Sequence, residues 1–336
     1  MIPFKSRKKR LSVSQQLLLP NVRPQTKEKP AILAYFQALR PRQWTKNLIV
    51  FAAPLFAFSL TPASLLGSLL AFALFCCASS SFYLVNDIMD VESDRRHPVK
   101  CKRPIAAGLV SIPAGITMAV LLLGSSLVIG WWKSPGLGAA ILGYALLQVA
   151  YNLTLKHKVI VDVVAIAAGF ILRACSGAAA TNIMLSPWFL LCTAMLALFL
   201  GIEKRKAELR LSEIKGSKSR RVLDRYSLPL LSRMEGVVTN GTILTYALWS
   251  SGPAVNGAST SWMMLTVPFV LYGVFRYQLL SDPEEIGRRN PGIEGGGKTE
   301  RPEEVLLGDR PLLLNVLLWL ITTFTILIIK KQGLIQ

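Results

Sequence analysis

The chain has 336 residues, of which 52% are hydrophobic and only 17% are charged, and its formal net charge is +19. Soluble domains typically carry about 25% charged residues, so this composition excludes an ordinary soluble enzyme. Several apolar runs reach the roughly 20 residues that a membrane-spanning helix needs. Lys and Arg gather in the loops on one side of these runs, which is the positive-inside pattern of membrane proteins. The charge therefore indicates a polytopic membrane protein, and we expect no nucleic-acid partner.

Residues 1–30 are basic and polar, and we expect a mostly disordered cytoplasmic tail there rather than a cleavable signal. Residues 31–336 then form a single transmembrane domain, because the apolar runs recur along that whole length. The cysteines are Cys76, Cys77, Cys101, Cys175 and Cys192. Most of them lie in apolar runs and none forms a CxxC pair, which argues against a disulfide framework and against a zinc site.

We expect an all-α bundle of about nine transmembrane helices. Their approximate ranges are 48–60, 64–86, 109–131, 137–155, 159–180, 187–202, 235–252, 262–280 and 311–329. The sixth helix continues to Ile214 as a charged extension, which an i,i+4 pair of Lys204 and Glu208 supports. With the N-terminus inside, this count places nearly every basic cluster in the cytoplasm, whereas eight or ten spans would put a large basic loop outside.

The first span enters through Pro41-Arg42-Gln43-Trp44-Thr45-Lys46. Pro41 suits the first turn of a helix, and Trp44 suits the headgroup layer. Arg42 and Lys46 share one face of an α-helix, because they are four residues apart. Two interpretations stay open: the pair anchors the span at the membrane surface, or it holds an anionic group at the cytoplasmic mouth.

The second span ends in an acidic stretch that stands out in a basic chain, at residues 86–94. At about 100° per residue, Asn86, Asp87, Asp90 and Asp94 fall on one helical arc about a quarter-turn wide. Oxygen ligands at this density suit Mg²⁺, which binds through a few carboxylates and substrate phosphates. The sequence therefore predicts a magnesium site with Asn86, Asp90 and Asp94 as its ligands.

Cations follow the acidic stretch directly. They are Arg95, Arg96, Lys100, Lys102 and Arg103, and His97 lies among them. A metal–diphosphate would be held from both sides by such an arrangement, and the alternative is membrane anchoring alone. His97 precedes Pro98 and so takes extended geometry, which favours a structural role over that of a general base.

A second polar cluster is expected where the fourth span meets the fifth. Tyr151 and Lys156 end the fourth span, Asp162 begins the fifth, and the connection between them is short. Arg173 lies on nearly the same helical face as Asp162 but about 16 Å deeper. An arginine at that depth must face a partner or a wet cavity, and the residues leave both possibilities open. Small residues at 169, 176 and 177 on that face allow close helix packing.

Two motifs of this sequence resemble those of a known superfamily. The stretch Asn86-Asp87-x-x-Asp90-x-x-x-Asp94 and the later Arg103-Pro104-Ile105-Ala106-Ala107-Gly108 resemble the first signature of the UbiA superfamily of intramembrane prenyltransferases. The resemblance implies nine spans around a central cavity that opens to the cytoplasm, with Asp-rich motifs that hold Mg²⁺–diphosphate. A second DxxxD motif would be expected after the fourth span, where this chain has Tyr151-Asn152-Leu153-Thr154-Leu155-Lys156-His157.

That departure looks like the decaprenyl-phosphate phosphoribosyltransferase branch of the superfamily. Further matches are residues 40–47, Lys204-Arg205-x-Ala207-Glu208-Leu209, and Pro302-Glu303-Glu304-Val305 with Asp309-Arg310. The resemblance implies a multi-pass enzyme of a bacterial-type plasma membrane that works in cell-envelope biosynthesis. It would use Mg²⁺ to transfer 5-phosphoribose from phosphoribosyl diphosphate to a polyprenyl phosphate lipid.

The resemblance also assigns roles to residues. Asn86, Asp90 and Asp94 would hold Mg²⁺ on the diphosphate, while Lys46 and Lys156 neutralise charge on the leaving group. Tyr151 and Asp162 would position the ribose or the water shell of the metal, and Lys204 and Arg205 would clamp a phosphate. The other expected substrate contacts are Arg42, Asp87, Arg95, Arg103 and Arg173. Asp90, Asp94 and Lys156 are the expected catalytic groups.

Two other functions compete with this one. An aromatic prenyltransferase of the same superfamily would use a prenyl diphosphate, and the missing carboxylates after the fourth span argue against it. A lipid-phosphate transporter or flippase would catalyse no covalent chemistry. Transporter folds often contain internal repeats, and none is evident in this sequence.

Overall fold

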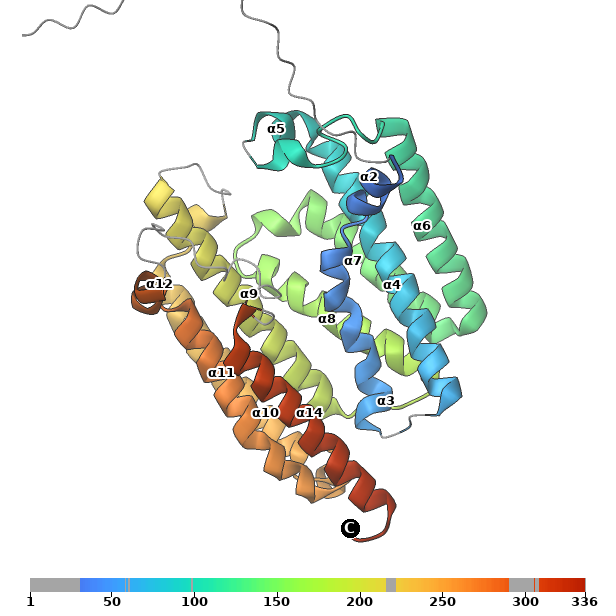
Figure 1. Ribbon diagram of the computed structural model, residues 1–336, viewed down its shortest axis with the longest axis vertical. Coiled ribbons are helices and arrows are strands. Elements are labelled where there is room, and N and C mark those ends of the chain that lie inside the picture. Colours follow the sequence, from blue (N-terminus) through green and yellow to red (C-terminus); the bar gives the residue numbers. More distant parts are fainter. Residues whose placement is uncertain are drawn as a thin grey trace, which may run out of the picture.

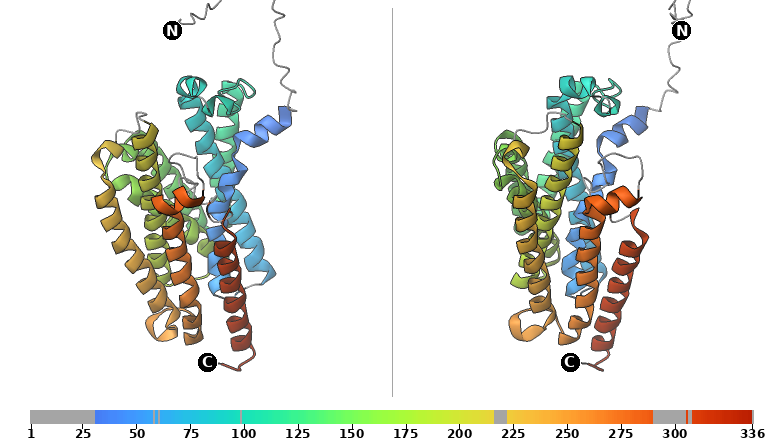
Figure 2. Two further views of the ribbon diagram at one scale, coloured as in Figure 1. Left: turned by 60° about the vertical axis from the view of Figure 1, so that its left-hand side comes forward. Right: turned by 90° about the vertical axis from the view of Figure 1, so that its left-hand side faces the viewer.

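The computed structural model describes residues 31–57, 59, 61–97, 99–215, 222–289, 305 and 308–335, and all regular structure within them is helical. The tail expected at 1–30 and the matched residues 302–304 lie outside this part of the chain. The long helices lie side by side as one bundle, with α5 at one end and the C-terminus at the other (Figures 1 and 2). We refer to the first of these as the α5 end.

The helices form two groups in Figure 1. The first group comprises α2 (Ala31–Ala38), the 3₁₀ helix η1 (Pro41–Phe51), α3 (Ala52–Phe56), α4 (Pro62–Met89), α5 (Val91–Arg96), η2 (Lys100–Lys102), α6 (Ile112–Lys133), α7 (Pro135–Leu153), η3 (Leu155–His157) and α8 (Val161–Thr181). The second comprises α9 (Pro187–Lys215), η4 (Leu223–Arg225), α10 (Leu228–Ser250), η5 (Pro253–Val255), η6 (Ser261–Thr266), α11 (Val267–Ser281), α12 (Pro283–Arg289) and α14 (Arg310–Lys331).

The starts of the long helices follow from local sequence. Each of the caps Thr61, Ser111, Ser134, Ser227 and Asp309 accepts a hydrogen bond from a backbone N–H in the first turn, and a proline occupies one of the next two positions. A capping oxygen satisfies an N–H that has no partner inside the helix, and proline there loses no hydrogen bond. These caps explain why α4, α6, α7, α10 and α14 begin where they do.

Among the residues that the structure describes, seven helices are long and apolar enough to cross a membrane. They are α4, α6, α7, α8, α9 as far as Glu213, η6 with α11, and α14. The other two expected spans correspond to η1 with α3, and to α10, so a count of nine stays a prediction. The first span begins at Pro41, as expected, but it differs from a single long α-helix because it consists of the 3₁₀ helix η1 followed by the short α3, which ends at Phe56. The charged continuation of the sixth span is confirmed as part of one unbroken helix, α9.

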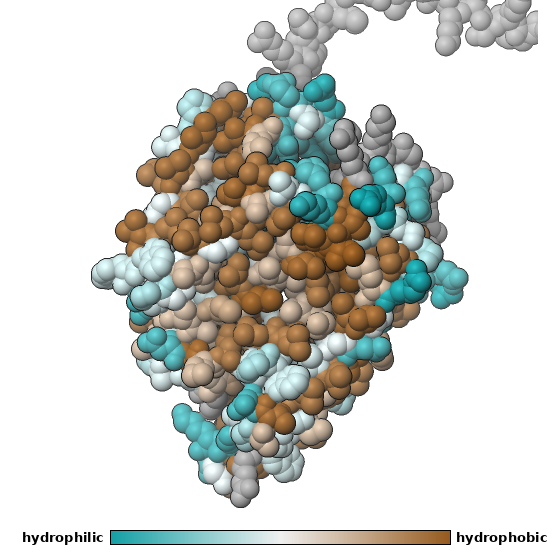
Figure 3. All heavy atoms as spheres, turned by 180° about the vertical axis from the view of Figure 1, so that it is seen from behind, coloured by the Kyte–Doolittle hydropathy of each residue, from teal (hydrophilic) through white to brown (hydrophobic). Residues whose placement is uncertain are grey.

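One face of α6 is apolar and unpacked. Ile116, Val120, Leu121 and Val128 are all at least half exposed, as expected for side chains that meet lipid. Apolar residues also dominate the middle of the face in Figure 3, and hydrophilic residues gather toward its ends. Such a band is what a bilayer of about 30 Å hydrocarbon thickness requires.

Close backbone contact joins α8 to η1. A Cβ atom added to Gly177 would lie 1.9 Å from the carbonyl oxygen of Val50, so only glycine permits this approach. The expectation of close packing on this face of the fifth span is confirmed. The contact fixes η1 against the bundle and thereby positions the polar residues that η1 carries.

All five cysteines are free thiols, as expected.

Candidate active site

A cavity of about 210 Å³ lies among η1, α4, α7, α8 and α9. Its walls are Lys46, Tyr83, Asn86, Tyr144, Leu147, Gln148, Tyr151, Asn152, Ala165, Ile166, Gly169, Phe170, Arg173, Leu200, Gly201 and Lys204. Three cations from three different helices face it, and no carboxylate belongs to this lining. A cavity with this charge suits an anionic ligand.

Lys46 reaches the cavity because η1 is a 3₁₀ helix. Three residues make one turn of such a helix, so Lys46 lies above Gln43 and its ammonium donates a hydrogen bond of 2.6 Å to the Gln43 amide oxygen. Arg42, four residues before Lys46, is rotated about 120° away and is exposed. The expectation that Arg42 and Lys46 share a face is therefore wrong, since it assumed α-helical geometry.

A polar stripe on α7 forms a second wall. Tyr144, Gln148 and Asn152 recur at i,i+4 spacing, which places them on one side of the helix, and Tyr151 lies beside them in the lining. The sequence prediction included Tyr151 and missed the other members. Their spacing was the available signal, because a regular polar stripe within an apolar span is expensive unless it faces water or a ligand.

Arg173 forms part of the wall deeper in the bundle and is 6% exposed. Its guanidinium donates hydrogen bonds to Asn47 Oδ1 at 2.7 Å, to the Gly169 carbonyl at 2.8 Å and to the Tyr144 hydroxyl at 3.0 Å. The two possibilities left open by the sequence both occur, because Arg173 is held by neighbours and also lines a cavity. Asn47, fully buried on η1, was not anticipated.

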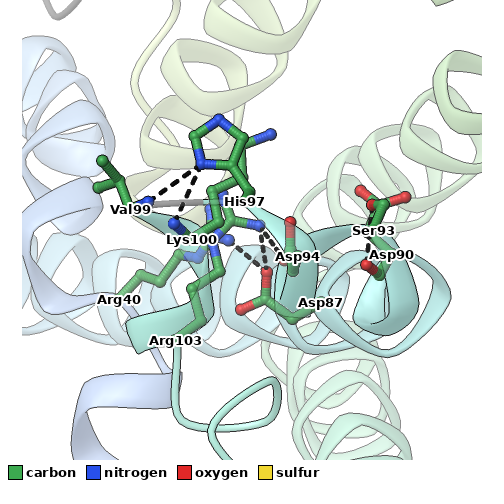
Figure 4. Close-up of polar contacts among 9 residues, drawn as sticks. All are labelled: Arg40, Asp87, Asp90, Ser93, Asp94, His97, Val99, Lys100 and Arg103. Atoms are coloured by element: carbon green, nitrogen blue, oxygen red, sulfur yellow. Dashed lines mark hydrogen bonds and ion pairs between the residues drawn. The ribbon is translucent and has the colours of Figure 1, made fainter. Parts of the chain in front are cut away.

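The acidic stretch does not form one ligand ladder, contrary to expectation. The helix breaks at Asp90, between α4 and α5. Asp87 and Asp94 point toward Arg103, which donates hydrogen bonds to them at 3.1 Å and 2.6 Å. Asp90 lies apart from these three side chains (Figure 4). Arg40 also pairs with Asp87. Two arginines therefore neutralise the two buried carboxylates, and Asp87 and Arg103 make these ion pairs rather than line the cavity.

The oxygen donors left over fit a divalent cation at the α5 end. Asn86 lines the cavity, and Asp90 follows it by one helical turn with an exposed carboxylate. Oδ1 of Asp94 is buried and has no hydrogen-bond partner among the described residues. Amide and carboxylate oxygens are the ligands that Mg²⁺ prefers when substrate phosphates and water complete its shell. Preformed clusters of three or more acidic, His or Cys side chains are absent from the described residues.

The second polar cluster is built around Arg205. Its guanidinium is fully buried and donates to Asp162 at 2.7 Å, to Glu208 at 2.5 Å and to the Tyr151 hydroxyl at 3.3 Å. The expected roles of Arg205 as a phosphate clamp and of Asp162 as a substrate contact are therefore wrong, because both side chains are 0% exposed and neither lines the cavity. Arg205 instead holds Tyr151, which does line it.

Tyr226 completes this cluster from the segment before α10. Its hydroxyl donates to Asp162 at 2.8 Å and accepts from the backbone N–H of Ile160 at 2.7 Å. Ile160 has a φ of 70°, a strained value for a β-branched residue that surrounding bonds must maintain. Burial raises the pKa of Tyr226 to about 12, so the phenol stays protonated at neutral pH and continues to donate.

A third buried charge group connects α9 to α10 and α11. The Lys206 ammonium donates to Glu203 at 2.8 Å and also pairs with Glu235. Gln278 donates to Glu235 at 2.7 Å and to Thr239 at 3.2 Å. None of these side chains lines the cavity, so the group joins the helices of the second half to one another.

Three other predicted residues lie around the site. Lys204 lines the cavity, and its ammonium lies 3.9 Å from Glu208, which confirms the predicted i,i+4 pair. Lys156, expected to be catalytic, lies on η3 and is not part of the lining. Arg95 is half exposed and pairs with Glu92 at 3.0 Å.

Known proteins resemble this chain in sequence and in fold. The family model described as the UbiA prenyltransferase family matches residues 47–290. A decaprenyl-phosphate phosphoribosyltransferase of Mycolicibacterium smegmatis is 38% identical over 87% of this chain and 92% of its own length. One of Mycobacterium tuberculosis is 37% identical over 85% of this chain and 91% of its own. A solved UbiA homolog from Archaeoglobus fulgidus, bound to GPP and Mg²⁺, superimposes with a TM-score of 0.64 at 19% identity, over 87% of this chain and 98% of that one.

Proposed function

This chain belongs to the UbiA prenyltransferase family, and we propose that it is a transferase that moves 5-phosphoribose from phosphoribosyl diphosphate to a polyprenyl phosphate. The cavity carries the proposal: Lys46, Arg173 and Lys204 converge on it from three helices, without a carboxylate in the lining. Where a second acidic motif would serve a prenyl diphosphate, α7 presents Tyr151 and Asn152. The names of the relatives that match most of both chains agree with this function.

The reaction needs little covalent help from the protein. An ionised phosphate oxygen of the lipid attacks C1 of the ribose, and the bond from C1 to the diphosphate breaks with its electrons going to the diphosphate. A phosphate monoester is already charged at pH 7, since its second pKa is about 6, so no general base is required. The main task of the protein is to orient both substrates and stabilise charge on the leaving group.

Residues at the α5 end suit the leaving group. Asn86 and Asp90 would hold Mg²⁺, with the free oxygen of Asp94 close by in sequence, and a bound Mg²⁺ neutralises diphosphate charge. Lys46 and Lys204 lie in the cavity wall and add positive charge there. Tyr151, fixed by Arg205, presents a phenol to the ribose. The acceptor tail extends into the bilayer that surrounds the bundle.

Orientation follows from the same residues. We propose that the α5 end faces the cytoplasm across a bacterial-type plasma membrane, because η2 and the last turn of α5 are basic and positive loops stay inside. A cysteine placed at position 100 should then resist an impermeant thiol reagent in intact cells. A cysteine at position 133, the last residue of α6, should react.

The test is turnover by the purified full-length chain with Mg²⁺. One reaction contains phosphoribosyl diphosphate and decaprenyl phosphate, and the other contains a prenyl diphosphate and 4-hydroxybenzoate. We expect a phosphoribosylated lipid in the first reaction and no prenylated aromatic product in the second. Prenylated product alone would refute the proposal in favour of an aromatic prenyltransferase. Absence of both products, together with movement of lipid phosphate across vesicles, would indicate a transporter.

A further inference from the structure

Arg173 occupies the inner end of the cavity. It lies eleven residues after Asp162, which begins α8, and this spacing corresponds to about 16 Å along the helix. Asn86 and Tyr151 line the same cavity near the α5 end. A ligand whose diphosphate is held near Asn86 therefore extends its other end toward Arg173.

The guanidinium of Arg173 is fixed but not saturated. A guanidinium has five N–H donors in a planar fork. Bonds to Asn47, Gly169 and Tyr144 fix its orientation, and the side chain still contributes to the cavity wall. The unused N–H groups can bind an anion, and a planar fork matches two oxygens of a phosphate.

The charge of Arg173 has no carboxylate partner among the described residues, because its three bonds end on an amide oxygen, a carbonyl and a phenol. Its Cζ carbon lies 4.6 Å from the centre of the Tyr144 ring and 5.6 Å from that of Phe170, and these contacts offset part of the cost of desolvating the guanidinium. In contrast, the buried cations Arg205 and Lys206 each pair with two carboxylates. A charge left uncompensated inside a membrane domain marks a functional group.

We propose that Arg173 binds the 5-phosphate of the donor and so selects a phosphorylated pentose. The inference rests on the proposed function, because it assumes a phosphoribosyl donor. That donor carries two anionic groups, the diphosphate on C1 of the ribose and the 5-phosphate at the opposite end of the sugar. A phosphate bound to Arg173 supplies the negative charge that no carboxylate among the described residues supplies to it. The acceptor phosphate is the other anion of the reaction, and the experiment separates the two.

The experiment compares wild type with Arg173→Gln on two donors, 5-phosphoribosyl diphosphate and ribosyl diphosphate without the 5-phosphate. Wild type should prefer the phosphorylated donor. Loss of a charge-assisted hydrogen bond predicts that Arg173→Gln lowers kcat/KM for that donor about 10- to 100-fold. The value for ribosyl diphosphate should change little, so the preference collapses. Arg173→Lys should restore part of it.

Binding of ribose 5-phosphate without Mg²⁺ gives a readout that needs no turnover. Wild type should bind it, and Arg173→Gln should not. Lys133→Gln is the matched control, because Lys133 is an exposed cation at the far end of α6, and it should behave as wild type. Thermal unfolding of each variant shows whether the fold is retained.

Each other outcome is decisive. Equal losses with both donors would overturn the proposal and assign Arg173 to the diphosphate or to the fold. A change in KM for the lipid alone would overturn it in favour of the acceptor phosphate. Failure of the proposed function is distinct from both, since wild type would then form neither phosphoribosylated lipid from the first donor nor ribosylated lipid from the second.

Discussion

Arg205 shows what a buried charge contributes at the scale of one residue. Its guanidinium is fully buried between Asp162 and Glu208. Removing one partner of a buried ion pair costs about 3–5 kcal/mol, because it leaves an uncompensated charge. We expect Arg205→Met to lower the free energy of unfolding by about that amount, measured as a lower thermal midpoint in detergent. Turnover should fall as well, because Tyr151 loses its hydrogen-bond donor.

The matched control removes the opposite charge too. Adding Asp162→Asn to Arg205→Met leaves fewer unpaired charges, so the double variant should be more stable than the sum of the single effects predicts. If Arg205→Met instead raised KM for the donor without any loss of stability, Arg205 would be a substrate contact. That result would contradict the structural role that the burial of Arg205 assigns to it.

The residues that line the cavity were easier to predict from the sequence than the hydrogen-bond and ion-pair partners of the polar residues. Lys46, Asn86, Tyr151, Arg173 and Lys204 were all predicted at the site and all line the cavity. A polar or charged side chain within an apolar span is informative by itself, since burying it is expensive. Its partner comes from another helix, far away in sequence. Helical angles on one helix therefore do not reveal that Arg103 turns Asp94 away from Asp90.

At the scale of elements, the contact between α8 and η1 makes a sharp prediction. A Cβ at Gly177 would overlap the Val50 carbonyl, and overpacking of this kind costs about 1–3 kcal/mol or more. Gly177→Ala should therefore lower the thermal midpoint. It should also reduce turnover, because η1 carries Lys46 into the cavity.

Gly124 provides the control for this substitution. It lies inside α6, and a Cβ added there meets nothing within 4 Å. Gly124→Ala should leave stability unchanged or raise it by up to about 1 kcal/mol, since alanine favours helix over glycine. Equal effects of the two substitutions would contradict the close contact between α8 and η1.

Helix positions were predictable because apolar length and caps are local properties. The expected ranges 137–155 and 159–180 match α7 and α8 to within a few residues. The residues of η1 do not predict its 3₁₀ geometry, and η1 packs against α4 and α8, which are distant in sequence. That geometry decides which of Arg42 and Lys46 reaches the cavity, so a small error in helix type became an error in the site.

At the scale of the whole molecule, the buried carboxylates lie outside the cavity lining. One group joins Asp87 and Asp94 to Arg103, and a second joins Asp162 to Arg205. In each group the carboxylates are neutralised by arginine. Three cations, Lys46, Arg173 and Lys204, line the cavity, and that lining contains no carboxylate. This charge suits a phosphorylated sugar as the ligand of a protein of the prenyltransferase family.

The most direct measurement of this claim is equilibrium binding to the intact wild-type chain in the presence of Mg²⁺. Phosphoribosyl diphosphate and geranyl diphosphate share the diphosphate and differ in what it carries, so their competition isolates the role of the cavity. We predict that phosphoribosyl diphosphate binds at least about tenfold more tightly, a difference of about 1.4 kcal/mol. Tighter binding of geranyl diphosphate would show that the cavity is built for a hydrocarbon and would contradict the account.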